Sequence, residues 1–510
     1  MRGARRIVIA ALATTLVAGA CGGGGSSGDS LRYGLDFELN LSDTFDPQQS
    51  LSTCDRIVLE FIYGTLTTLD EENRPQPGLA ESWEDNGDTF LIHLREGLEF
   101  SDGTPFDAQA VADGLNYIKT GEQTNEGLVE VESAEAVDET TVQLNLSGSG
   151  FALPYTLSQR EGMIPHPDTY DTEDPESGTA AENPIGAGPF VFEEFQPGEH
   201  IVLTRNENYG GPGDWDGIPG IEFTQVGVGG PAVNALSGGE VDVITYESES
   251  QETIDSESHL GSNRRLGEVY AQLQLRLDEP FDDPLVRQAV NHAIDREEYI
   301  EVVHGGFGEV AWMPYPEASP NYDPDLAERY PHEPERAREL LAQAGHPDGI
   351  EFDMAIPGGV TGQERQGELL QEQLAEAGIT ADIVPLGTDI ATEYYLQRGA
   401  DAFSAARPAS PDPTGQIYAQ WAEFQFVAIH NDAERPDITE LIRQARAAPT
   451  DEERVELMQE AERIVVEEAL EVPIAFVPRN VAWDTDRIEG ELGAPAEICD
   501  PVHLEGVTLR

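Results

Sequence analysis

The sequence has few basic residues, and lysine is almost absent from it. There are 29 Lys and Arg side chains against 97 Asp and Glu, a formal net charge of -68, and Lys119 is the only lysine. A nucleic acid or an anionic lipid surface would be repelled, so neither is expected as a partner. The acidic residues are spread along a chain whose 39% hydrophobic content argues against disorder. This pattern predicts a folded, halophilic protein, with an acidic surface for a cationic partner as the alternative.

Long apolar runs are missing from the chain after its N-terminal segment. No later stretch approaches the roughly 20 apolar residues of a membrane-spanning helix. The N-terminus is basic in "MRGARR", then apolar, and reaches Cys21 behind three small residues. This order is typical of a secretory signal peptide over residues 1–20. A cysteine at this place resembles the bacterial lipobox, although Ala18 stands where leucine is usual. An ordinary secretory signal with a chance cysteine is the alternative.

We therefore expect the N-terminus to anchor the protein. Cys21 would carry the lipid, and residues 21–30, which lack apolar content, would form a flexible tether. The expected location is the outer face of the cytoplasmic membrane, which is the periplasm if a second membrane exists.

Cysteine is scarce too, with three in the whole chain. With Cys21 assigned to the lipid, Cys54 and Cys499 remain. An even pair outside the cytoplasm permits one disulfide, and two unrelated free thiols are the alternative. No CxxC or HxxxH spacing occurs, so no metal site is expected.

Motifs of catalysis are missing as well. The chain has no HExxH or Walker A sequence, and its one GxSxG match, residues 24–28, lies in the glycine-rich stretch after the apolar N-terminus and not in a nucleophile elbow between a strand and a helix. The stretches "GVGGP" and "HGGFGEV" lack the glycine spacing of nucleotide-binding loops. Among 97 acidic residues, pairs of carboxylates occur at any spacing by chance, so they do not indicate a glycosidase. We expect neither a reaction nor a cofactor.

Hydrophobic periodicity predicts a mixed α/β protein. Alternating apolar residues indicate strands in "TFLIHL" and "TVQLNL", and helical spacing indicates a helix in 106–118. Further helices are predicted from Pro334 to Gly345 and after Thr450, which has capping-box spacing to Glu453. Strand-like "EFDMAIP" and "TADIVPL" flank a helix-like "RQGELLQEQLAEAG", and this βαβ pattern predicts a parallel sheet.

Ordered motifs over nearly the whole chain resemble the family 5 extracellular solute-binding proteins, the peptide and nickel class of receptors of ABC importers. They include "YGTLTTLD", "PGLAESWEDNGDTFLIHLREGLEFSDGTPFDAQAVADGL", "NPIGAGPFVFEEFQPGEHIVLTRNENY", "FDDPLVRQAVNHAIDREEYIEVVHGGFGEVAWMPYP" and "VPIAFVPRN". Two parts of these motifs have an expected structural role. Asp102, Gly103 and Pro105 suit a turn, and Gly186 and Gly188 suit a close bend against another lobe.

The resemblance implies a periplasmic-binding-protein-like type II α/β fold, with two lobes, a hinge and an inserted subdomain. Lobe I would comprise residues 31–53, 185–268 and 480–510, the subdomain residues 54–184, and lobe II residues 269–479. The ligand would lie between the lobes, where closure excludes water.

The resemblance also implies where the ligand binds, with contacts expected from Ser52, Thr53, Trp312, Tyr315, Arg407 and Asp412. Peptide-binding members often carry W-x-A-D-x-x-D/E-P, whose first aspartate pairs with the amino terminus of the peptide. The corresponding "AARPASPDPTG" has Ala406 and Ala409 in place of the tryptophan and that aspartate, and keeps Asp412. We expect the amine partner to be absent and Arg407 to supply a positive charge instead; a shifted loop in which Asp412 binds the amine is the alternative.

The predicted function is that of a monomeric, lipid-anchored receptor that captures an oligopeptide-like or related small solute and delivers it to an ABC permease, without chemistry of its own. A receptor for metal chelates or another non-peptide solute is one alternative. A receptor that presents its ligand to a membrane sensor is another. A surface hydrolase would need a nucleophile motif that the chain lacks.

Overall fold

The structure is a computed structural model of the whole chain. It describes residues 30–35, 44–50, 53–70, 73–121, 124–172, 174, 177–357, 361–387, 399–407, 412, 414–415, 421, 435–495 and 499–510. Cys21 and the predicted signal peptide lie outside these residues. In the described part of the chain, no helix is both long and apolar enough to cross a membrane.

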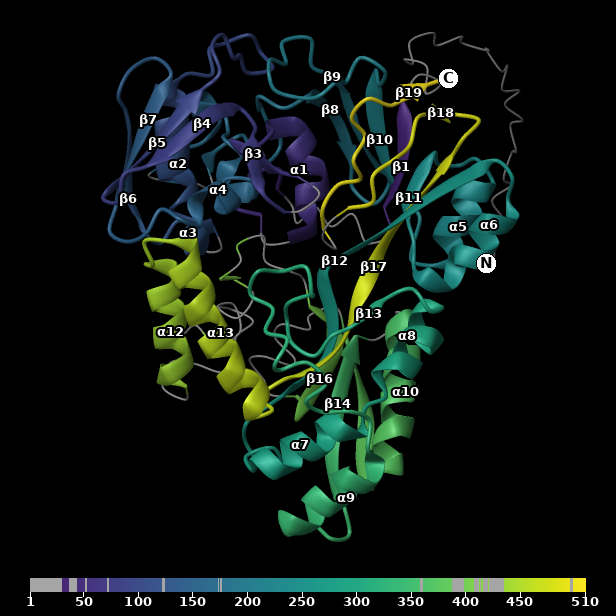
Figure 1. Cartoon of the computed structure of the whole chain (residues 1–510). Coiled ribbons are helices and arrows are strands. Elements are labelled where there is room, and N and C mark those ends of the chain that lie inside the picture. Colours follow the sequence, from purple (N-terminus) through teal and green to yellow (C-terminus); the bar gives the residue numbers. More distant parts are fainter. Residues whose placement is uncertain are drawn as a thin grey trace, which may run out of the picture.

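One large mixed sheet runs through the molecule (Figure 1). The described part of this sheet has 11 strands. Strand β1 is parallel to its partners β10 and β11, and β14 is parallel to its partners β15 and β16. Every other described pair in the sheet is antiparallel. In sheet order the strands are β15 (Ile379–Leu386), β14 (Ile350–Pro357), β16 (Ala402–Arg407), β12 (Leu260–Leu275), β17 (Val472–Asp484), β11 (Val243–Thr245), β1 (Leu31–Leu35), β10 (Gly220–Gln225), β9 (His200–Arg205) and β8 (Phe190–Gln196), with β13 (Glu309–Val310) paired to β17.

The long strands β12 and β17 join the two halves of the molecule. They pair from Leu260 opposite Asp484 to Leu273 opposite Val472, with a register shift between Leu266 and Tyr270. β11 pairs with β17 at one end of this ribbon, and β16 pairs with β12 at the other. The chain therefore crosses between the halves twice, which is the pattern expected of a two-lobed fold with a hinge.

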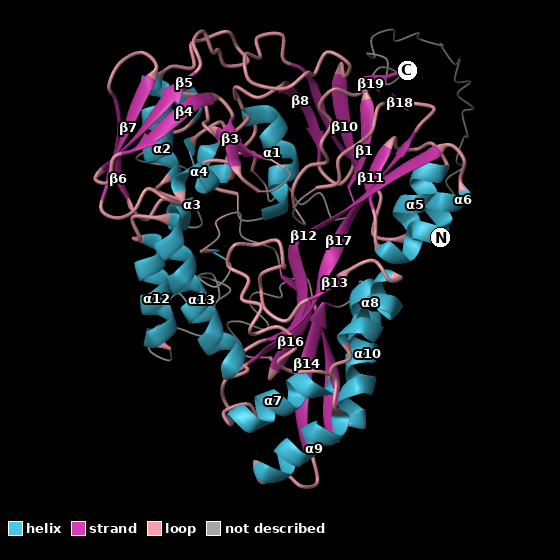
Figure 2. Ribbon diagram, in the orientation of Figure 1, coloured by secondary structure: helices cyan, strands magenta, loops and turns pink. Residues whose placement is uncertain are grey.

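Helices flank the sheet (Figure 2): α8 and α10 run along the right side of the lower strands, and α12 and α13 form a separate pair to the left. The helices are α1 (Arg56–Tyr63), α2 (Ala108–Ile118), α3 (Thr124–Gly127), α4 (Leu153–Thr156), α5 (Gly230–Ser237), α6 (Gln251–Ser256), α7 (Pro284–Ala293), α8 (Arg296–His304), α9 (Pro334–Gln343), α10 (Thr361–Glu376), α12 (Pro436–Arg446) and α13 (Asp451–Glu467), with the 3-10 turns η1 (Thr53–Asp55) and η5 (Ser248–Ser250).

Buried apolar side chains form separate cores in three regions. The N-terminal lobe buries α1, β1, β8 to β11 and residues 481–507 around one core. The subdomain has its own core within residues 66–187. The second lobe has two large cores within residues 269–477. The exact domain boundaries stay predictions, and α1 packs in the N-terminal lobe although the predicted subdomain range includes it.

The subdomain contains a four-stranded antiparallel sheet of β4 (Ala80–Asp85), β5 (Thr89–Leu94), β7 (Thr141–Leu146) and β6 (Val131–Ala136). Both strands predicted from alternation, β5 and β7, are confirmed, and each buries every second residue. The short strands β2 (Thr67–Leu69) and β3 (Pro75–Pro77) form a separate hairpin, and β18 (Ile488–Glu489) pairs with β19 (Thr508–Leu509).

The predicted helices are also confirmed. α2 begins after Asp107, whose side chain accepts a hydrogen bond from the Ala110 amide. α13 begins after Thr450, whose hydroxyl accepts from the Glu453 amide. The βαβ prediction is right, because β14 and β15 are parallel with α10 between them in the chain.

The glycines before Pro189 have a different neighbour from the one expected. A Cβ atom on Gly186 would lie 2.4 Å from the carbonyl oxygen of Ile62, and a Cβ atom on Gly188 would lie 2.5 Å from the carbonyl oxygen of Phe61. The close approach was predicted correctly, but the partner is helix α1 and not another lobe. The turn at Asp102 forms as expected, since its carboxylate accepts a hydrogen bond from the Thr104 amide.

Candidate functional site

At the junction of the lobes, β12, β16 and β17 share a face of buried side chains that ends at Arg407. Arg407 is the last residue of β16 and pairs with Tyr270 of β12, which in turn pairs with Phe476 of β17. Residues paired across neighbouring strands project from the same face of a sheet. The Tyr270 hydroxyl lies 3.5 Å from the Gln272 side chain and 3.4 Å from the Glu471 carboxylate. Arg407 therefore extends a face that already carries hydrogen-bonding side chains.

Arg407 is buried, with 8% of its surface exposed. Within the described part of the chain, no hydrogen bond or ion pair reaches its guanidinium group. None of its nitrogens is among the fully buried side-chain atoms without a partner, so the group keeps contact with solvent, and an anion is the group that would pair with it best. The chemistry of this position thus favours a carboxylate or another anionic group.

Asp412 is buried as well, but its carboxylate is occupied. It accepts hydrogen bonds from the Thr414 amide at 2.8 Å and from the Thr414 hydroxyl at 2.8 and 2.9 Å. Arg446 of α12 donates to the other carboxylate oxygen at 3.0 Å. Asp412 holds a turn and an ion pair, so it has little capacity left for the ammonium group of a ligand.

Trp312 and Tyr315 lie together against one core of the second lobe. The guanidinium group of Arg296 stands 4.9 Å from the centre of the Trp312 ring. Burial lowers the pKa of Arg296 to about 10. Tyr315 is 1% exposed and part of the core itself. These contacts give both residues a structural role.

The remaining two predicted residues give little information. Ser52 lies outside the described residues, and Thr53 is described only as the first residue of η1. The structure brings Trp312 and Tyr315 together, whereas no contact in the described part of the chain joins either of them to Arg407 or Asp412.

Sequence analysis missed a group of arginines where β12 and β17 cross between the lobes. Arg265 pairs directly with Arg479, and Arg264 with Asn480. Like charges placed opposite each other destabilise a strand pair. Arg264 also donates to the Asn480 side chain at 3.1 Å and stands 4.1 Å from the centre of the Phe307 ring. The sequence feature that could have indicated this group is the pair of adjacent arginines, Arg264 and Arg265, in a chain with only 29 basic residues.

A cavity of about 240 Å³ lies beside α1 in the N-terminal lobe. Its walls come from α1, the β2–β3 hairpin, Arg265 and residues 500–505, with Tyr209 and Trp215 among the aromatic side chains. Trp312, Tyr315, Arg407 and Asp412, the predicted ligand residues whose side chains the structure describes, do not line it. Ligand pockets usually measure roughly 300 to 1,000 Å³. The cavity lies slightly below this range.

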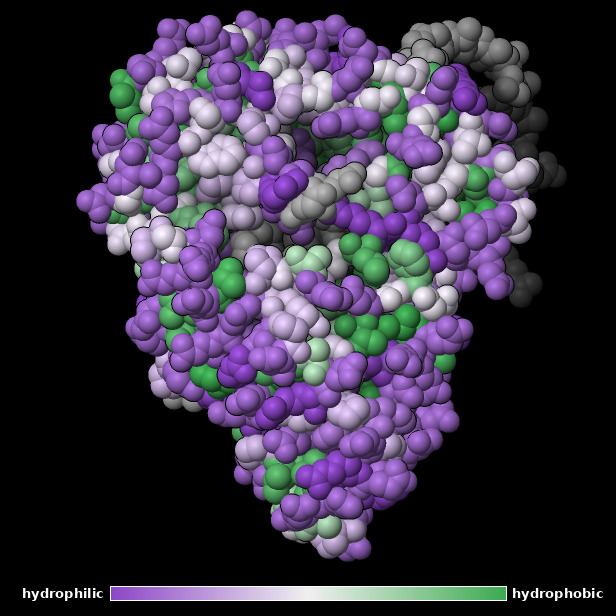
Figure 3. Space-filling model, viewed as in Figure 1, coloured by the Kyte–Doolittle hydropathy of each residue, from purple (hydrophilic) through white to green (hydrophobic). Residues whose placement is uncertain are grey.

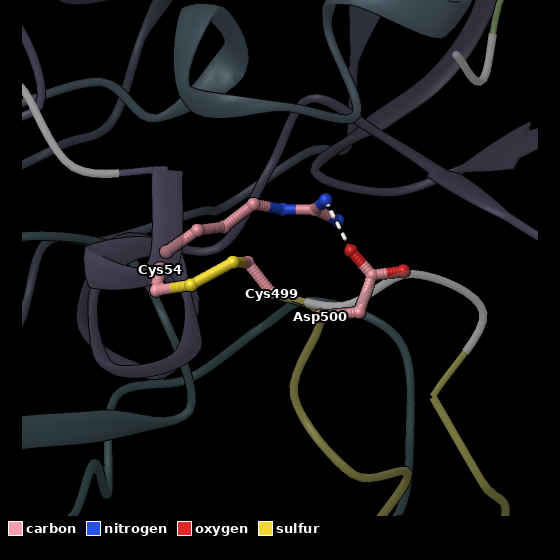
Figure 4. The surroundings of a disulfide bond; sticks show 4 residues. Cys54, Cys499 and Asp500 are labelled. Carbon is pink, nitrogen blue, oxygen red and sulfur yellow. Dashed lines mark hydrogen bonds and ion pairs between the residues drawn. A yellow bond between two sulfur atoms is a disulfide. The ribbon is translucent and has the colours of Figure 1, made fainter. Parts of the chain in front are cut away.

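One wall of this cavity is tied to α1 by a covalent bond. Cys54 and Cys499 form a disulfide across 445 residues of sequence, and Asp500 lies beside it (Figure 4). The Asp500 carboxylate accepts a hydrogen bond from Arg56 at 2.5 Å. The disulfide and the ion pair together fix the C-terminal segment against the first helix.

Comparisons with known proteins agree with this architecture. The glutathione-binding protein GsiB of Escherichia coli (strain K12) is 26% identical over 408 residues, covering 76% of each chain. NikA from Brucella suis, solved with Fe(III)-EDTA, superposes with a TM-score of 0.83 at 22% identity, covering 94% of this chain and 99% of that one. DppA from Helicobacter pylori, solved with the peptide STSA, gives 0.79 at 23% identity over 94% and 98%.

A third solved structure, the periplasmic binding protein AgaA from A. tumefacien R10 in complex with agropinic acid, gives a TM-score of 0.78 at 24% identity, covering 94% of this chain and 98% of that one. Residues 74–426 match the family of bacterial extracellular solute-binding proteins, family 5. This match spans more than half of the chain and includes β16 and Arg407. The chain therefore belongs to the family 5 solute-binding proteins, the substrate-binding components of ABC importers.

Proposed function

We propose that this protein binds a small solute between its lobes by an anionic group of that solute, and delivers it to an ABC permease from a lipid anchor at Cys21. The observation that carries the anionic preference is the guanidinium group of Arg407, a residue that is 8% exposed and has no partner among the described residues. Releasing the solute to a permease requires no reaction.

The contrast between Arg407 and Asp412 supports an anion over an amine. Asp412 already has its partner in Arg446, and Arg407 has none. A solute that carries a carboxylate would complete the site, whereas an ammonium group would meet an unpaired cation.

The solutes of structural neighbours fit this proposal in different ways. AgaA was solved with agropinic acid, NikA with Fe(III)-EDTA and DppA with a peptide. An acid, a chelate rich in carboxylates and a peptide with a carboxyl terminus each offer an anion. A metal chelate is accordingly the second candidate solute, because it would pair with Arg407 through the same chemistry.

Calorimetry in molar salt tests the proposal with short peptides in free, N-acetylated and C-amidated forms, and with carboxylate chelates of metals. N-acetylation should leave binding unchanged, and C-amidation should abolish it. Arg407→Ala should weaken binding by about 1.5–3 kcal/mol, the value of a hydrogen bond to a charged group. Arg336→Ala is the matched control, since Arg336 is an exposed arginine paired with Glu339 on α9. Binding that requires the free amine would refute the anionic site.

A further inference from the structure

The second lobe touches the subdomain at a contact well away from the crossing strands. Figure 1 shows α12 and α13 below α3, to the left of β12 and β17. The residues that meet there are Arg446 and Arg454 on the side of the second lobe, and Glu130 and Phe151 on the side of the subdomain. The proposed function assigns no role to Glu130, Phe151 or Arg454, and uses Arg446 only as the partner of Asp412.

Arg446 binds two carboxylates from different parts of the molecule. It is the last residue of α12, and its side chain is 13% exposed. One guanidinium nitrogen lies 3.0 Å from Asp412, and another lies 3.5 Å from Glu130. The backbone at Glu130 is held in place, because its carbonyl accepts a hydrogen bond from the Ser147 amide at 2.8 Å. One arginine thus connects the segment after β16 to the rim of the subdomain.

Arg454 makes a second contact at the same interface. Its guanidinium group lies 3.3 Å from the centre of the Phe151 ring. The same group donates to Asp451 at 2.5 Å and to the Ala448 carbonyl at 3.1 Å, so it is fixed to the turn between α12 and α13. A cation over an aromatic face is attracted by the ring quadrupole.

This contact consists of an ion pair and a cation–π pair, and a contact of this composition can open and close. The buried apolar side chains of α12 and α13 pack in a core of the second lobe, and the core of the subdomain is separate from it. No apolar core therefore has to be broken when the two surfaces part, and water can solvate the charged groups. Pairs of this kind contribute modestly, which lets them shift a conformational equilibrium without fixing it.

We propose that Arg446 is a latch that favours the closed arrangement of the lobes and ties the segment containing Asp412 to it. Opening breaks the Arg446 contact with Glu130, while the contact with Asp412 stays because both residues belong to the second lobe. Asp412 is thereby linked to closure. This inference rests on the proposed two-lobed receptor function, since a latch has a purpose only where the lobes move.

Small-angle X-ray scattering without added solute tests the latch, using the mature chain in molar salt. Glu130→Gln and Arg446→Met should each increase the radius of gyration, by shifting the ratio of open to closed molecules about two- to five-fold. Arg336→Met removes an exposed arginine from α9 and should leave the radius unchanged. The double variant Glu130→Gln/Arg446→Met should expand no more than Arg446→Met alone, because both changes break the same pair.

Thermal unfolding of each variant shows whether it is folded, and only variants with a cooperative transition are compared. If Arg446→Met fails this check, Glu130→Gln and Phe151→Leu test the same interface from the subdomain. An unchanged radius in folded Glu130→Gln, or equal expansion in Arg336→Met, would overturn the latch. The measurement uses no solute, so its failure is distinct from a failure to bind anionic solutes in calorimetry.

Discussion

Replacing Glu462 by methionine is expected to stabilise the protein, and to do so more at alkaline than at acidic pH. Glu462 lies on α13, fully buried, and neither of its carboxylate oxygens has a hydrogen-bond partner. Burial raises the pKa of Glu462 well above its ordinary value, and the nearby carboxylates of Glu471 and Asp323 raise it further. The folded protein therefore holds a proton that the unfolded chain releases.

The sign and the size of the effect follow from this difference. Below the unfolded pKa of 4.5 both states are protonated, and the stability linked to Glu462 is fully present. As the pH rises through the folded pKa this stability is lost, at a rate of at most about 1.4 kcal/mol per pH unit. Methionine has a similar volume, no charge and no oxygen that needs a hydrogen-bond partner, and a buried polar group without such a partner costs about 1–3 kcal/mol.

Urea unfolding of both proteins at pH 5 and pH 8, in molar salt, measures this effect. The advantage of Glu462→Met over the wild type should be larger at pH 8. Glu460→Met is the control, since Glu460 is an exposed glutamate on the same helix and should show no such difference between the two pH values. An advantage that is equal at both pH values, or a variant less stable than the wild type at pH 8, would refute the reasoning.

Two further predictions concern the anchor and the surface. Cys21→Ser should release the protein into the medium or leave it unprocessed, and a variant that still partitions into detergent as a lipidated protein would contradict the lipobox. The melting temperature should rise from low to molar salt, because hydrophilic residues cover most of the face in Figure 3 and carboxylates dominate the charged residues. The Debye screening length falls from about 10 Å at 0.1 M salt to about 3 Å at 1 M, so screening becomes stronger. A melting temperature that does not change across this range would exclude the halophilic interpretation.

The positions of helices and strands could be predicted from the sequence because they depend on the spacing of apolar residues within a short stretch of chain. The alternation in β5 and the helical spacing in α13 each reflect which side of an element faces a core. Met458, Ala461 and Val465 follow helical spacing along α13, and all three are buried. Glu462 is buried on the same helix, but a search for apolar residues does not find it because glutamate is polar.

The sequence by itself determined the local elements and, through its ordered motifs, the family. Only the tertiary structure decided which distant residues meet. Asp412 is paired with Arg446, 34 residues later in the chain, and Arg265 lies opposite Arg479 because β12 and β17 form one ribbon. Such contacts depend on how the whole chain packs, and no local periodicity records them. The role of a charged side chain here follows from its partner, and the fold supplies that partner.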